Sequence, residues 1–171
     1  MKAVILCLVT LTAAQPSCAA PDVANYLAVR DWTAYDSKAK FTMPAQDIAP
    51  VMYYSKGSKV PSCGLLSGPA SAPKFIDILA AEPGEQYPHC PNINDAAAFK
   101  LAGKDYLVFE YTDQDSRNET YEQFFYVYKN SAGDYVADER LNEQVGAAAS
   151  PGKTRKASEG IGLARKHALE R

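Results

Sequence analysis

The clearest pattern of hydrophobic and polar positions lies between Ala96 and Leu141, where short runs of strand-forming residues alternate with polar turns. Valine, tyrosine and phenylalanine favour extended backbone, and glycine near a run's end favours a turn. The pattern therefore predicts four strands, at residues 97–102, 106–112, 120–129 and 135–138. Strands this short and closely spaced indicate an antiparallel meander.

The third of these strands carries large side chains on both faces. Side chains alternate along a strand, so Phe125 and Val127 point one way while Phe124, Tyr126 and Tyr128 point the other. Such a strand suits a sheet covered on both sides, or a sheet with one face that binds a partner. We favour core packing, because aromatic residues dominate protein interiors.

The rest of the chain is less regular. Residues 24–32 and 48–54 read as strands, and residues 60–94 contain many prolines and glycines. Within that region, residues 74–81 fit a strand or a helix, and we favour the strand. Residues 158–170 fit a short helix after a boundary at residues 150–152. The expected fold is mainly β or α+β, a meander or sandwich in one domain over 20–150 with a tail over 151–171.

The first 19 residues have the parts of a secretory signal peptide: a positive charge at Lys2, an uncharged stretch over 3–14, and small residues where signal peptidase would cleave. Cleavage after Ala14 or after Ala19 fits this pattern. Lipid attachment at Cys18 is a less favoured alternative, because Gln15 stands where an apolar residue is wanted. No apolar stretch reaches the roughly 20 residues that span a bilayer, so we expect a periplasmic or secreted protein without a transmembrane segment.

Two cysteines, Cys63 and Cys90, lie securely within the mature chain. In an oxidising compartment they predict a disulfide, which would stabilise the fold by about 3–4 kcal/mol. The alternative is a reactive thiol beside His89.

Charge is unevenly distributed, with a formal −7 over residues 20–150 and +4 over residues 151–171. The basic tail would suit an anionic surface, although a solvated terminus is the simpler interpretation. We expect no nucleic-acid partner, because the acidic body would repel phosphates.

Candidate chemistry is sparse. Ser71 and Lys74 match the Ser-x-x-Lys pattern of penicillin-recognising enzymes, but the Lys-Thr-Gly element is missing and we expect no catalysis there. His89 and His167 make no zinc spacing, and residues 113–119 depart from a calcium loop at Arg117, so we expect no metal or cofactor. Glu110 and Glu122 on adjacent strands are a candidate pair for glycoside chemistry.

These observations favour a small exported binding protein without enzyme activity, such as an inhibitor of an exported hydrolase or an immunity protein. A protein partner would contact the acidic loop and nearby tyrosines, for which we select Asp113, Asp115, Arg117, Tyr121 and Tyr128. The first alternative is an exported hydrolase of envelope carbohydrate or peptide, which a pocket with two converging carboxylates of perturbed pKa would favour. The second is an envelope structural protein held by its basic tail.

Overall fold

The structure is a computed structural model that describes residues 20–37, 39–82, 84–87, 90–114, 116–146 and 155–169. The expected signal peptide, the boundary at 150–152, His89 and Asp115 lie outside these residues. No helix within the described residues is long and apolar enough to cross a membrane. The elements, in chain order, are α1 (Val23–Val29), β1 (Thr33–Ala34), β2 (Ile48–Tyr54), β3 (Ser62–Ser67), β4 (Lys74–Leu79), β5 (Asn92–Leu101), β6 (Lys104–Gln114), β7 (Thr120–Lys129), β8 (Tyr135–Ala137), α2 (Glu139–Gly146) and α3 (Ala157–Leu169).

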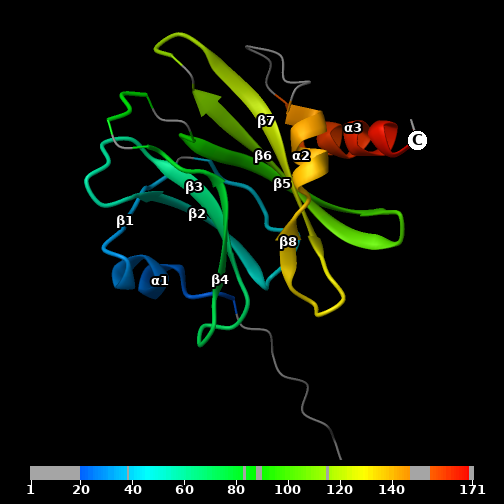
Figure 1. The fold of residues 1–171 in the computed structure, drawn as a ribbon, viewed down its shortest axis with the longest axis horizontal. Coiled ribbons are helices and arrows are strands. Elements are labelled where there is room, and N and C mark those ends of the chain that lie inside the picture. The colour runs from blue at the N-terminus through cyan, green and yellow to red at the C-terminus, as the bar shows by residue number, and fades with distance from the viewer. Residues whose placement is uncertain are drawn as a thin grey trace, which may run out of the picture.

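The strands form two antiparallel meanders that pack face to face. Strands β1 to β4 make one sheet, called sheet A here, and strands β5 to β8 make the other, sheet B, each in sequence order. Helix α1 lies against the outer side of sheet A, and α2 and α3 lie against the outer side of sheet B (Figure 1). The predicted fold class is confirmed: a mainly β domain with a C-terminal helix.

The space between the two sheets holds the largest cluster of buried side chains. Leu65 of sheet A and Phe109 of sheet B are fully buried there. The predicted disulfide between Cys63 and Cys90 is present in the same cluster, with its Cα atoms 5.7 Å apart. It joins β3 of sheet A to the segment that enters β5 of sheet B.

Sheet B is covered on both faces, as the alternation along residues 120–129 predicts. Phe125 and Val127 face sheet A, whereas Phe124 and Tyr126 face α2 and α3. The Tyr126 hydroxyl donates to the Gly160 carbonyl of α3 at 2.8 Å, so the polar end of this buried ring is satisfied. The strongest hydrophobic pattern in the chain therefore builds the central layer.

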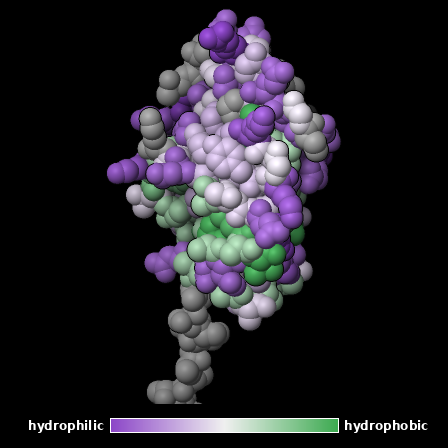
Figure 2. Space-filling model, turned by 90° about the vertical axis from the view of Figure 1, so that its left-hand side faces the viewer, coloured by the Kyte–Doolittle hydropathy of each residue, from purple (hydrophilic) through white to green (hydrophobic). Residues whose placement is uncertain are grey.

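The prediction of a strand over 24–32 is wrong, because residues Val23–Val29 form α1. The Asp22 side chain accepts a hydrogen bond from the Asn25 backbone nitrogen at 3.0 Å and caps the helix. Tyr26 then stacks on Phe75 of sheet A, with ring centroids 5.5 Å apart. In the view of Figure 2, apolar side chains gather on the lower part of the face, at the height of α1 in Figure 1.

Three further elements were missed by sequence reasoning: the two-residue strand β1, strand β3 and helix α2. Strand β3 lies in the region rich in breakers, but its Gly64 is required, since a Cβ there would lie 2.4 Å from the Phe75 ring. Helix α2 has no long apolar run; the buried side chains described in it are Leu141 and Val145, one turn apart. The Asp138 carboxylate caps it by accepting from the Leu141 nitrogen at 3.0 Å.

The segment before β2 lies along β5, the edge strand of sheet B. Its contacts run from Ser37, whose hydroxyl donates to the Asn92 side chain at 2.9 Å, to Ala45, which packs against the core between the sheets. Further on, the Asp47 carboxylate accepts from Lys129 at 2.6 Å and from the Tyr135 hydroxyl at 3.1 Å, which ties the two sheets together.

Two glycines of α3 provide a matched test of this packing. A Cβ at Gly160 would lie 2.8 Å from the Phe124 ring and 2.9 Å from Val108, whereas a Cβ at Gly162 would meet nothing within 4 Å. Gly160→Ala should therefore destabilise the protein by about 1–3 kcal/mol, and Gly162→Ala should stabilise it by about 1 kcal/mol. Urea unfolding followed by circular dichroism checks both, and equal stability of the two variants would show that α3 does not pack closely on sheet B.

Candidate ligand-binding site

The candidate site begins with a β-bulge in β5. Ile93 pairs with Tyr111 and Asp95 pairs with Glu110, so Asn94 is an extra residue in the ladder. A bulge re-aims the side chains beside it. Because of the bulge, the side chains of the consecutive residues Asn94 and Asp95 both make contacts on the face of sheet B that carries Glu110.

The Asn94 amide lies at the centre of a network of polar side chains on three strands. Its Nδ2 atom lies 3.0 Å from Glu110 Oε1, 3.1 Å from Glu122 Oε2 and 2.9 Å from Thr112 Oγ1. The Thr112 hydroxyl in turn lies 3.2 Å and 3.3 Å from the two carboxyl oxygens of Glu122. One amide and one hydroxyl thus hold two carboxyl groups together.

Among the described residues, Glu110 carries the most deeply buried carboxyl group, with 1% of the residue exposed. Burial raises the pKa of Glu110 to about 9, and a hydrogen bond with Glu122 adds to this rise, while the Asn94 amide opposes it. Glu110 therefore keeps its proton at neutral pH and donates it within the pair. Two carboxyl groups in contact share a proton in this way because both cannot ionise cheaply.

The carboxyl pair opens into a cavity of about 650 Å³. Its walls come from three parts of the chain: the sheet, the segment along the edge of β5, and the start of α3. The lining residues are Lys40, Phe41, Thr42, Asn94, Asp95, Glu110, Glu122, Arg155 and Lys156. The carboxyl groups occupy the sheet wall, and all three cations come from the two flanking segments, so the pocket is acidic on one side and basic on the others.

Asp95 holds the segment that carries the basic residues Arg155 and Lys156 beside the pocket. Its Oδ2 atom accepts a hydrogen bond from the Ala157 nitrogen at 3.0 Å, at the first residue of α3. A carboxylate at this position satisfies a free N–H and complements the helix dipole. Because Arg155 and Lys156 immediately precede α3, the same contact holds their backbone at the pocket. The Arg155 guanidinium lies 5.7 Å from the Phe124 ring centroid, which places it over the sheet.

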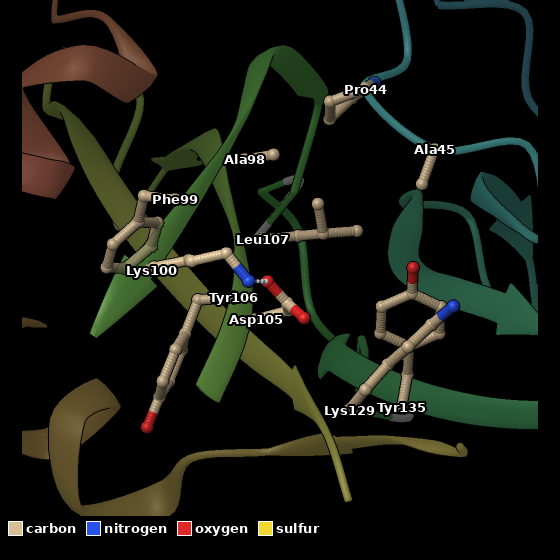
Figure 3. Close-up of a pocket in the computed structure, with 10 residues that line it drawn as sticks. All are labelled: Pro44, Ala45, Ala98, Phe99, Lys100, Asp105, Tyr106, Leu107, Lys129 and Tyr135. Carbon is tan, nitrogen blue, oxygen red and sulfur yellow. Dashed lines mark hydrogen bonds and ion pairs between the residues drawn. The ribbon is translucent and has the colours of Figure 1, made fainter. Parts of the chain in front are cut away.

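A second cavity, of about 420 Å³, lies toward the β5–β6 turn (Figure 3). Its charged groups already have partners: Lys100 pairs with Asp105, and Lys129 bonds Asp47. Leu107 and Ala98 point toward Pro44 and Ala45 across this cavity.

Of the residues selected from the sequence, those that the structure describes are not all close together. Asp113 and Tyr121 lie opposite each other near the β6–β7 hairpin, which ends at the top of Figure 1, and Arg117 is exposed at its tip. Asp113 accepts from the Gln123 side chain at 2.9 Å. Tyr128 lies seven positions from Tyr121 along β7, about 23 Å at 3.3 Å per residue, and it packs against Tyr106.

Other candidate chemistry fares less well. Lys74 is ion-paired with Asp134. Within the described residues, no three His, Cys, Asp or Glu side chains gather as a metal-binding group. Among the sequence candidates that the structure describes, Glu110 and Glu122 lie together in a cavity, and the bulge residue Asn94 was missed.

Comparisons of the chain with protein-family models, with curated proteins and with solved structures find no match.

The Glu110 carboxyl predicts an unusual pH dependence of stability. The folded state keeps this proton up to pH about 9, whereas an unfolded glutamate loses it near pH 4.3. The folded state binds more protons between these values, so its stability falls as pH rises. Glu110→Gln mimics the protonated group and should flatten this decline in urea unfolding between pH 5 and 9. An unchanged slope would show that Glu110 ionises normally.

The hairpin tip gives a separate test of a protein partner. Arg117 is exposed, so Arg117→Glu reverses a charge without disturbing packing, and Arg140→Glu on α2 is the matched control. If a partner binds the hairpin, Arg117→Glu should weaken its capture from secreted and envelope extract at least about tenfold while Arg140→Glu captures normally. Equal capture by both variants would remove the hairpin from the interface.

Proposed function

We propose that this protein is a small exported binding protein that holds a polar ligand in the pocket of Glu110 and Glu122. The observation that carries the proposal is the carboxyl pair held by Asn94 on the wall of an open cavity with cations on its other sides. The buried disulfide is compatible with an oxidising compartment outside the cytoplasm.

The position of the polar residues supports a binding role. Along β6, the face toward the helices carries Tyr106 and Val108 and then Glu110 and Thr112. The apolar residues lie beneath α2 and α3, and Glu110 lines the cavity. A buried carboxyl pair is not needed for stability, since apolar residues of similar size usually stabilise a fold as well or better.

The second candidate is an exported hydrolase, which is favoured by the protonated state of Glu110. A carboxyl group that keeps its proton at neutral pH can act as a general acid, with Glu122 as its partner. The contact between the two groups argues against glycoside hydrolysis, because the reacting sugar and water need about 5–9 Å between the carboxyl groups. Of the hydrolases expected from the sequence, one acting on peptides therefore fits better.

Glu110→Gln separates the two candidates. The variant keeps the shape and hydrogen bonding of the protonated carboxyl but cannot transfer a proton. A binding protein should keep its ligand affinity within a few-fold, whereas a hydrolase should lose turnover by about 10²–10⁴-fold, the usual contribution of a general acid.

The pocket predicts which variants respond to a ligand. In a thermal-shift screen of the mature protein against polar metabolites, saccharides and short peptides, at least one class should raise the melting temperature. Glu122→Gln should lose that shift, and Glu143→Gln, at an exposed position of α2, should retain it. A shift that survives Glu122→Gln, or the absence of any stabilising ligand, would contradict the proposed pocket.

A further inference from the structure

Opposite charges lie on different walls of the pocket, and this arrangement indicates the chemistry of the ligand. We propose that the pocket binds a zwitterion, specifically a short peptide with free termini, with its ammonium group at Glu122 and its carboxylate at Arg155 and Lys156. This inference rests on the proposed binding function and specifies the ligand class of the same site.

The acidic wall suits an ammonium group. Glu122 is only half-buried, whereas Glu110 behind it is almost fully buried, so Glu122 is the carboxyl group that a ligand reaches first. The Thr112 hydroxyl, which is buried and lies 3.2 Å from Glu122, helps to hold that carboxyl group in position. The Asn94 amide holds the Glu122 carboxyl in position from the other side.

The basic wall suits a carboxylate. Arg155 and Lys156 are consecutive residues at the start of α3, and arginine binds carboxylates through two parallel hydrogen bonds. The Asp95 contact to the Ala157 nitrogen keeps this segment beside the sheet. Phe41, half-buried on the third wall, offers an apolar surface for the part of the ligand between its two charges.

A ligand with one charge fits the pocket less well. An anion would satisfy the basic wall but would face Glu122 and Asp95 on the sheet. A cation would satisfy Glu122 but would meet Lys40, Arg155 and Lys156 on the remaining walls. Only a ligand that carries both charges is matched by both walls, because like charges brought together in an interface cost affinity.

Binding of the ammonium group should also displace the proton of the carboxyl pair. A positive charge beside the pair favours the ionised state of Glu110, as a cation does for any neighbouring acid. The proton then leaves Glu110 for solvent, and the ammonium group takes its place beside the pair. Peptide binding should therefore release a proton at neutral pH.

Three peptides that differ only in their terminal charges test the inference: Ala-Ala, N-acetyl-Ala-Ala and Ala-Ala amide. Isothermal titration calorimetry of the mature protein should show Ala-Ala binding about 10- to 100-fold more tightly than either blocked form, as expected when a charged hydrogen-bonding group is lost. Titrations in phosphate and in Tris, which differ in ionisation enthalpy, should show proton release for Ala-Ala. Glu110→Gln should bind Ala-Ala without releasing a proton.

Variants assign the two ends of the peptide. Glu122→Gln should remove the preference for Ala-Ala over N-acetyl-Ala-Ala, and Arg155→Gln should remove the preference for Ala-Ala over Ala-Ala amide. Glu143→Gln is the control that should change neither, and circular dichroism confirms that each variant folds. Equal binding of the three peptides, or no binding of Ala-Ala, overturns the inference. If another ligand class still gives a thermal shift that depends on Glu122, the proposed function stands; if none does, the proposed function fails as well.

Discussion

The structure depends on the burial of sheet B on both faces. Sheet A covers one face through the cluster that contains the disulfide, and α2 and α3 cover the other through Phe124, Tyr126 and Val108. Antiparallel sheets commonly leave one face to solvent, so a second covering layer is a demanding arrangement. It makes large side chains necessary at consecutive positions of β7, and it forces close contact at Gly160, where α3 approaches the sheet.

The pocket arises where this second layer ends. Beyond the first residue of α3 the described residues place no helix on the sheet face, and the strands there carry Glu110, Thr112 and Glu122 in place of apolar residues. The bulge at Asn94 supplies the donor that holds the carboxyl groups together, and its neighbour Asp95 fixes the start of α3. One irregularity in an edge strand thus positions both the acidic and the basic walls.

The sequence predicted the parts of this arrangement that follow from local periodicity. Alternation along β7 predicted both buried faces, and the adjacency of two strands suggested Glu110 with Glu122. It did not predict α1, because Val23, Tyr26 and Val29 favour a strand locally and only packing against sheet A selects the helix. It did not predict Asn94, because a bulge depends on pairing with a distant strand. Tyr128 was grouped with the hairpin although it lies near the opposite end of β7.

The most direct test of the central claim is the protonation state of Glu110 in the unliganded protein. Carbon-13 NMR of the glutamate side-chain carboxyl carbons, followed from pH 4 to pH 10 and assigned with Glu110→Gln, measures it without a ligand. A carboxyl carbon that stays in its protonated position at neutral pH and titrates near pH 9 is the predicted result. Titration of every glutamate near pH 4.3 would show that the pair shares no proton, and the account of the pocket would be wrong.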